Sequence, residues 1–271
     1  MRRHLLCAVA TMAAACAAPA HAATYTLCAE PGPRSPWFQV ERGPDGAPTG
    51  RLTGLSVELL QAAFARMGHE ARIRADLPWS RCMAMVELGK IDFAFDAYRD
   101  DERARRFDFS APYQILTPQV FYLKQTPLKA ANVTELKQYR GCGLLGSSYA
   151  HYGFARGELD QGTAMFDALI RKLKAGRCDY FPEELESILV VPNADGTFDD
   201  PALGHRAIAG ARAPARHLIT ARAGPAAALL PAFGAAVAAL YASGAVKAMW
   251  HRNVPMLPYR DCPACGRAGS R

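Results

Sequence analysis

The sequence predicts an α/β protein of two lobes with a cleft between them. Segments with the composition of strands alternate with segments of helical periodicity, which is the pattern of an α/β sandwich with a mainly parallel sheet. Half of the 271 residues are hydrophobic, which is enough to fill two modest cores. The alternation breaks near residues 125–127 and 206–214, where we expect the chain to cross between lobes. Two crossings form a hinge, and a ligand cleft commonly lies beside one.

The first 22 residues predict a secretory signal peptide. They begin with the basic stretch MRRH, continue with an alanine-rich apolar run and end on the A-x-A cleavage pattern of residues 20–22. The run is too short and too weakly apolar to remain as a transmembrane helix. Cys16 leaves a lipoprotein as the less favoured alternative, because Ala13 stands where a lipoprotein signal normally has leucine. We therefore expect a soluble mature chain, exported to the periplasm and starting near Ala23.

Residues 23–124 and 215–271 are assigned to the first lobe. Its expected strands cover residues 25–29, 73–76, 91–95, 119–123 and 217–221, and its expected helices cover residues 57–67, 79–88 and 229–240, with a short helix from residue 100. Val57, Leu60 and Phe64 recur at helical spacing, and Gly68 ends their helix. Residues 31–49 are rich in Pro and Gly and predict a loop.

Residues 125–214 form the second lobe in this prediction. Its expected helices cover residues 133–139 and 164–174, and its expected strands cover residues 143–145 and 179–181. Another helix is expected to begin near Tyr149, directly after Ser147 and Ser148. Serine is a common N-cap residue, so these two side chains could cap that helix, face a ligand, or do both.

Six cysteines follow the signal, and an even number in an exported chain favours disulfides over thiols or metal ligands. The candidate pairs are Cys142 with Cys178, Cys28 with Cys82, and Cys262 with Cys265. The C-P-A-C spacing of the last pair could also be a redox dithiol, but such sites follow a strand at a helix start. In a Pro- and Gly-rich tail we prefer a local structural disulfide. Zinc would need two further ligands that the tail does not offer.

The charge and the motif content exclude several classes of function. The formal net charge of +7 weakly favours anionic ligands or surfaces. No run of Lys and Arg has the interleaved aromatic residues of a nucleic-acid site, so no nucleic-acid partner is expected. The sequence offers no phosphate-binding loop, no metal motif and no nucleophile–base pair at a recognisable spacing. We therefore expect neither a cofactor nor a metal.

The segment GKIDFAFDAYRDDERARRFDFSAPY, residues 89–113, is the most informative part of the chain. A strand leads to Asp100 and Asp101, where a short helix is expected to begin with Arg103 in its first turn. A helix N-terminus presents unpaired N–H groups and a partial positive charge. An arginine beside it can therefore form a cradle for an anion.

The order GK-D, ER and DFS-x-PY in this segment resembles the signature of the bacterial family 3 extracytoplasmic solute-binding proteins. Further resemblances lie in GLSVELL at residues 54–60, GSSY at 146–149, LKAGRCD at 173–179 and the closing KAMW at 247–250. They extend over nearly the whole mature chain. The resemblance implies a two-lobed type II periplasmic-binding-protein fold that captures a polar amino acid for an ABC importer.

The resemblance also implies which residues hold the ligand. The planar guanidinium of Arg103 would bind both oxygens of the ligand's α-carboxylate. Ser147 and Ser148 would donate hydrogen bonds to the same carboxylate. Glu184 would bind the ligand's ammonium group. The other candidates are Glu30 after the first strand, Trp37 and Trp79 as stacking partners, Arg81 in the PWSR element, and Tyr98 and Asp96. The structural alternatives are a surface ion pair for Arg103, a solvated carboxylate for Glu184 and core packing for the tryptophans.

Three positions depart from the pattern of amino-acid receptors. Tyr98 and Asp96 stand where that pattern has small residues, and Asp100 stands where it has threonine. Asp100 can cap the short helix but repels an anion. A buried aspartate beside Arg103 or Arg81 would partly neutralise the cradle. These departures argue against an α-amino acid as the ligand, although the fold and the cleft remain expected.

We expect a monomeric, non-enzymatic protein that captures a small polar, carboxylate-bearing metabolite, such as an amino acid or a related compound, for the membrane subunits of an ABC importer. One alternative is a ligand sensor without transport. The other is a periplasmic enzyme on the same scaffold, similar to cyclohexadienyl dehydratase, in which Glu30 or Glu184 would serve as acid or base.

Overall fold

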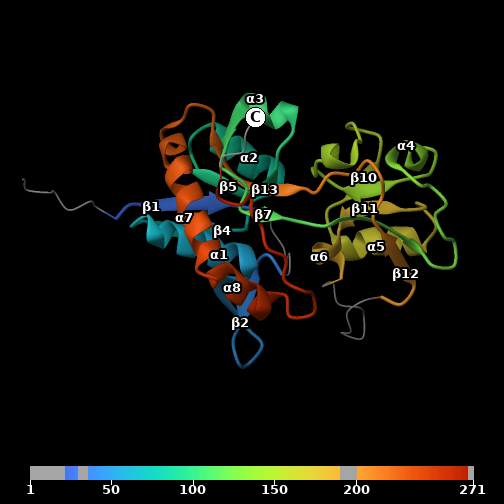
Figure 1. The fold of residues 1–271 in the computed structure, drawn as a ribbon, viewed down its shortest axis with the longest axis horizontal. Coiled ribbons are helices and arrows are strands. Elements are labelled where there is room, and N and C mark those ends of the chain that lie inside the picture. The colour runs from blue at the N-terminus through green and yellow to red at the C-terminus, as the bar shows by residue number, and fades with distance from the viewer. Residues whose placement is uncertain (1–21, 30–35, 190–199, 268–271) are drawn as a thin grey trace, which may run out of the picture.

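The structure, a computed structural model, describes residues 22–29, 36–189 and 200–267. Figure 1 shows two lobes side by side, one holding the N-terminal strand and the C-terminal helices and the other holding the middle of the chain. This is the two-lobed α/β architecture that the sequence predicts. Except for Ala22, the predicted signal peptide lies outside the described residues, and so does Glu30.

A mixed sheet of six strands forms the centre of the first lobe. Its strands are β1 (Thr24–Cys28), β4 (Glu70–Arg74), β5 (Phe93–Tyr98), β6 (Phe107–Phe109), β7 (Gln114–Ile115) and β13 (Ala215–Ala221). They lie in the order β4-β1-β5-β13-β6, and β7 pairs with β13. β1 is parallel to β4 and β5, but β13 is antiparallel to its neighbours. The prediction of a mainly parallel sheet is wrong for β13, which lies between β5 and β6, because β13 enters the sheet from the end at which β5 leaves it.

Helices cover both faces of this sheet. They are α1 (Leu55–Arg66), α2 (Trp79–Glu87), α3 (Asp101–Arg106), η2 (Pro225–Leu229), α7 (Leu230–Ala242) and α8 (Ala245–Asn253). On one face, Phe64 of α1 packs against Phe93 and Phe233, with ring centroids 5.8 and 6.0 Å apart. On the other face, Cys82 and Val86 of α2 are buried with the sheet residues of a second cluster.

A hairpin replaces part of the loop expected at residues 31–49. It consists of β2 (Gln39–Arg42) and β3 (Pro48–Thr53), which pair antiparallel. The strands are short and the turn between them contains glycine and proline, so the sequence of this segment has the composition of a loop. The hairpin projects from the first lobe below α8 (Figure 1).

One described segment, Pro225–Ala242, is long and apolar enough to cross a membrane by length and composition alone. It comprises η2 and α7, and it is part of the first-lobe core. Leu230, Phe233 and Val237 are buried there against α1 and the sheet. Packing therefore accounts for its apolar face.

The second lobe contains two small sheets. The antiparallel sheet has the order β11 (Phe181–Glu184), β8 (Pro118–Leu123), β12 (Leu203–Arg206), and the parallel pair is β9 (Cys142–Leu144) with β10 (Asp160–Thr163). The helices are α4 (Val133–Leu136), η1 (Ala150–Tyr152), α5 (Phe166–Lys174) and α6 (Leu185–Ile188).

The chain enters the second lobe before β8. Because β8 pairs with β11 and β12, the predicted lobe boundary at residue 124 is wrong. Apolar alternation identifies a strand but not the sheet that it joins. The backbone N–H of Leu116 donates to the carbonyl of Pro214 at 3.0 Å, so the outgoing and returning segments lie side by side. Directly after Pro214, β13 begins at Ala215.

Three disulfides join the six described cysteines in the predicted pairs. They are Cys28–Cys82, Cys142–Cys178 and Cys262–Cys265, with Cα–Cα separations of 5.9, 5.8 and 5.3 Å. These separations lie in the usual range for a disulfide. The first ties β1 to α2, the second joins β9 to the segment before β11, and the third closes a turn in the C-terminal tail.

Candidate ligand-binding site

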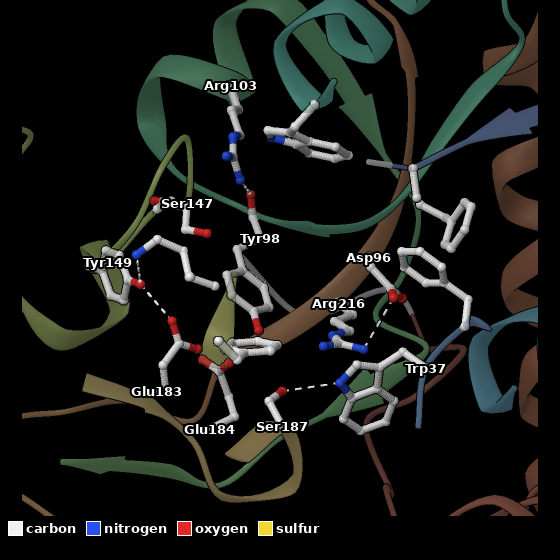
Figure 2. Close-up of a pocket in the computed structure, with 17 residues that line it drawn as sticks. Trp37, Asp96, Tyr98, Arg103, Ser147, Tyr149, Glu183, Glu184, Ser187 and Arg216 are labelled. Atoms are coloured by element: carbon white, nitrogen blue, oxygen red, sulfur yellow. Dashed lines mark hydrogen bonds and ion pairs between the residues drawn. The ribbon is translucent and has the colours of Figure 1, made fainter. Parts of the chain in front are cut away.

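A cleft lies between the two lobes, and both lobes supply its walls. Figure 2 shows the side chains that point into it. Eight of the ten predicted ligand-binding residues line this cleft: Trp37, Trp79, Asp96, Tyr98, Arg103, Ser147, Ser148 and Glu184. It encloses about 690 Å³ of space, part of which is open to solvent. The fold thus brings together residues that are up to 147 positions apart, from Trp37 to Glu184.

Arg103 spans the cleft from the first lobe. Asp100 accepts a hydrogen bond from the Arg103 backbone N–H at 2.8 Å and so caps α3, as predicted. The Arg103 guanidinium donates to the carbonyl of Tyr98 at 2.9 Å and to the carbonyl of Gly146, in the second lobe, at 3.2 Å. Its side chain is only 11% exposed, so it is not a surface arginine, but its Nε lies 3.6 Å from a carboxylate oxygen of Asp100, which is the ion pair that the alternative interpretation expected. Burial lowers the pKa of Arg103, and Asp100 opposes this shift.

The tryptophan and arginine of the PWSR element have different places. Trp79, the first residue of α2, lies beside Arg103, whose guanidinium carbon is 5.7 Å from the centre of its ring. Arg81 is exposed on α2 and is not among the residues that line the cleft, so its predicted site role is not supported. Residues two positions apart on a helix face in nearly opposite directions, which explains the difference.

Asp96 anchors a network at the base of the cleft. Its backbone has a φ of 58°, a left-handed conformation that aspartate tolerates better than most residues. Its carboxylate accepts hydrogen bonds from Ser56 at 2.9 Å, from Tyr113 at 2.5 Å and from Arg216 at 3.2 Å. Through the last of these hydrogen bonds, Asp96 fixes the position of Arg216.

Arg216, which the sequence analysis did not find, is a second buried cation of the cleft. Its guanidinium carbon lies 4.0 Å from the centre of the Trp37 ring, and its side chain is 7% exposed. Burial alone would lower the pKa of Arg216, but Asp96 and its tyrosine and glutamate neighbours raise it overall. Figure 2 shows Arg216 between Asp96 and Trp37. Because Trp37 is covered on this side and 1% exposed, it packs in the core as well as lining the cleft.

Glu184 is buried at the end of β11, with its side chain 3% exposed, so the alternative of a solvated carboxylate is wrong. Its Oε1 lies 3.2 Å from Nε2 of His151. Burial by itself would raise the pKa of Glu184, but His151, Arg216 and Tyr98 lower it overall. Its neighbour Glu183 also lines the cleft and accepts a hydrogen bond from Tyr149 at 2.6 Å.

Ser147 and Ser148 lie in the loop after β9 and line the cleft. The helix expected at Tyr149 is a single 3₁₀ turn, η1, which has no side-chain cap. The N-cap interpretation of these serines is therefore wrong. Gln161 donates to the Ser147 carbonyl at 2.9 Å and holds the loop against β10.

Among the described residues, the sequence analysis missed four polar residues that line the cleft, Tyr149, Glu183, Ser187 and Arg216, and also His151, which contacts Glu184. Tyr149 and Glu183 are adjacent in the sequence to predicted residues, but no role in the site was predicted for either. No local pattern points to Arg216 or Ser187, because only the return of the chain and the packing of α6 bring them to the cleft. Within the part of the chain that the structure describes, no group of three or more His, Cys, Asp or Glu side chains could hold a metal ion.

Known proteins share this fold and this sequence pattern. The family model "Bacterial extracellular solute-binding proteins, family 3" matches residues 46–252. The L-cystine-binding protein TcyJ of Escherichia coli K12 is 30% identical over 105 residues, which are 38% of this chain and 39% of that protein. The match thus spans about two fifths of the length of that relative.

Solved structures are similar over more of the chain. A substrate-binding protein of an ABC uptake transporter from Streptococcus pneumoniae, with bound histidine, has a TM-score of 0.68 at 16% identity and covers 89% of this chain and 94% of its own. A histidine kinase sensor domain with similarity to periplasmic binding proteins has a TM-score of 0.65 at 22% identity and covers 85% of this chain and 96% of its own. At these identities they show the fold. Together with the family match over more than half of the sequence, they establish that the chain belongs to family 3 of the bacterial extracellular solute-binding proteins.

Proposed function

We propose that this protein is a periplasmic receptor that captures a small carboxylate-bearing metabolite between its lobes and presents it to an ABC importer. The observation that carries the proposal is the place of Arg103. Its side chain lies in the cleft with 11% of its surface exposed, and its guanidinium already reaches a carbonyl of the opposite lobe. Such a group can bind a carboxylate through two parallel hydrogen bonds while both lobes close on the ligand.

The two chain crossings would serve as the hinge. Leu116 and Pro214 are hydrogen-bonded to each other, and Thr117 joins the second lobe through Glu186, whose carboxylate accepts from the Thr117 N–H at 2.9 Å and its hydroxyl at 2.7 Å. The lobes would rotate about this point, and opening would break cross-lobe contacts such as those of Arg103 with Gly146 and of Trp37 with Ser187. The lobe boundaries then lie near residues 116 and 214, and the protein acts as a monomer.

An enzyme on the same scaffold is the competing function. Among the described residues, Glu184 beside His151 is an arrangement that resembles an acid–base pair. A general acid at neutral pH needs a raised pKa, whereas the surroundings of Glu184 lower it. Glu184 is therefore disfavoured as a general acid, and Glu184 as a general base is the remaining form of the enzyme alternative.

Mass spectrometry of the small molecule that co-purifies with protein from the periplasm tests the proposal. A receptor should yield a carboxylate-bearing compound in a ratio of one per chain. Incubated with that compound in a sealed assay, a receptor returns it unchanged, whereas an enzyme depletes it with time. Depletion with turnover, or a bound compound without an anionic group, would contradict the proposal. Deletion of adjacent importer genes would separate a transport receptor from a sensor, because only the transport receptor loses uptake.

A further inference from the structure

The three carboxylates that line the cleft in the described part of the chain are engaged by side chains of the protein itself. Asp96 accepts from Ser56, Tyr113 and Arg216. Glu183 accepts from Tyr149. Glu184, which the family resemblance assigns to a ligand's ammonium group, contacts His151. An ammonium group entering the cleft would have to compete with these partners.

Tyr98 adds to the cover over Glu184 from the other lobe. It is the last residue of β5, and its ring packs edge-on against His151 with centroids 5.1 Å apart. Its hydroxyl is among the groups that interact with the Glu184 carboxylate. Tyr98 and His151 therefore take up the space and the hydrogen-bonding capacity that surround this carboxylate.

The electrostatic surroundings of Glu184 also disfavour a further cation. The Arg216 guanidinium, fixed by Asp96 and by the Trp37 ring, is near enough to act on the Glu184 charge. A ligand ammonium at Glu184 would be desolvated next to this fixed positive charge. Burying a charge without a well-formed partner is unfavourable, so the ammonium would weaken binding.

The other end of the cleft remains suited to an anion and a flat body. The Arg103 guanidinium has five N–H groups, and among the described residues it donates to two carbonyls and forms an ion pair with Asp100 at 3.6 Å, which leaves N–H groups for a ligand. Trp79 lies against it, and the loop of Ser147 and Ser148 faces it across the cleft. We propose that the ligand is a carboxylate with an apolar or aromatic body and without an α-ammonium group, and that Tyr98 and His151 are the residues that exclude amino acids. This inference rests on the proposed function, since it requires that Arg103 hold a carboxylate.

Matched pairs of compounds that differ only in the ammonium group test the inference. The pairs are 3-phenylpropanoate with L-phenylalanine, hexanoate with L-norleucine, and pentanedioate with L-glutamate, titrated by calorimetry into protein that has been unfolded and refolded to remove its ligand. In every pair with measurable binding, the compound without the ammonium should bind at least about tenfold more tightly, which corresponds to ~1.4 kcal/mol. Tyr98→Ala, which uncovers Glu184, should move this ratio toward the amino acid by a similar factor. Tyr98→Phe, which keeps the ring, should move it less.

The outcomes separate the inference from the function on which it rests. Tighter binding of the amino acids, abolished by Arg103→Ala, would overturn the inference and leave the receptor function standing. Binding of none of the six compounds would overturn the inference that a carboxylate with an apolar or aromatic body is the ligand, and the receptor function would still be decided by the co-purifying compound. If Tyr98→Ala does not fold, as judged by its melting curve, the wild-type pairs and Tyr98→Phe still decide between preference for the acid and preference for the amino acid.

Discussion

The indole N–H of Trp37 donates a hydrogen bond to the hydroxyl of Ser187 at 3.1 Å. These residues are 150 positions apart, and they belong to opposite lobes, since Trp37 precedes α1 and Ser187 lies in α6. Both are buried. A bond of this kind requires the lobes to be together, so it stabilises the closed arrangement relative to an open one.

Removing this bond should weaken ligand binding more than it weakens the fold. A single hydrogen bond contributes about 1 kcal/mol, so Ser187→Ala should lower affinity by about fivefold. The double variant of Ser187→Ala with Trp37→Phe should lose less binding free energy than the sum of the losses in the two single variants, because both substitutions remove the same hydrogen bond. Small-angle scattering should show a larger radius for Ser187→Ala at a subsaturating ligand concentration. Ser243→Ala, whose hydroxyl bonds within the first lobe, is the control, and equal effects of the two serine variants would contradict the cross-lobe role.

Asp96 should matter for folding rather than for binding alone. Asp96→Ala would leave Arg216 buried without its carboxylate partner, which costs roughly 3–5 kcal/mol. Asp76→Ala removes a pair with Arg74 in which both side chains are well exposed, and this should cost about 0–1 kcal/mol. Denaturant unfolding without ligand measures both values. A similar loss for the two variants would show that Asp96 does not hold Arg216 as described.

The disulfides should contribute unequally to stability. Cys142–Cys178 closes a loop with a sequence separation of 36 residues, whereas Cys262–Cys265 has a separation of 3. Because a longer loop restricts the unfolded chain more, the paired Ser substitutions should cost roughly 4 and roughly 2 kcal/mol respectively. Unfolding experiments on the two double variants test this order. A reversed order would mean that the tail disulfide holds more of the fold than its short loop implies.

The pKa of Glu184 predicts a pH dependence. A carboxyl group whose pKa is lower in the folded state contributes stability above its unfolded pKa, about 4.5, and this contribution is lost as the pH falls through the folded pKa. The difference in free energy of unfolding between wild type and Glu184→Gln should therefore shrink as the pH is lowered from 6 to below 4.5. Melting curves at several pH values measure it, and a difference that grows toward acid would have the wrong sign.

The fold was largely predictable because its signals are local or periodic. The spacing of Val57, Leu60 and Phe64 predicts the buried face of α1, and Asp100 marks the start of α3. The hairpin of β2 and β3 and the sheet membership of β8 were not predictable, since turn residues obscure the first and pairing over long distances decides the second.

The site divides in the same way. Arg103, Ser147 and Glu184 could be found because they stand in segments that resemble a family signature, and the cleft contains all three. Arg216 could not be found, because its place in the site depends on contacts with residues far away in the sequence. Asp96 on a neighbouring strand accepts its hydrogen bond, and the Trp37 ring packs against its guanidinium. The resemblance also could not show that Glu184 is already in contact with His151, a contact that depends on the fold of η1.

The central claim is that Arg103 grips a carboxylate between the lobes. Calorimetric titration of the compound identified by mass spectrometry into wild type, Arg103→Ala and Arg103→Lys tests it most directly. Loss of a charge-assisted hydrogen bond costs roughly 1.5–3 kcal/mol, so Arg103→Ala should bind at least about tenfold more weakly. Arg103→Lys should recover only part of the loss, because an ammonium cannot make two parallel bonds to a carboxylate. Wild-type affinity in a correctly folded Arg103→Ala would contradict the claim.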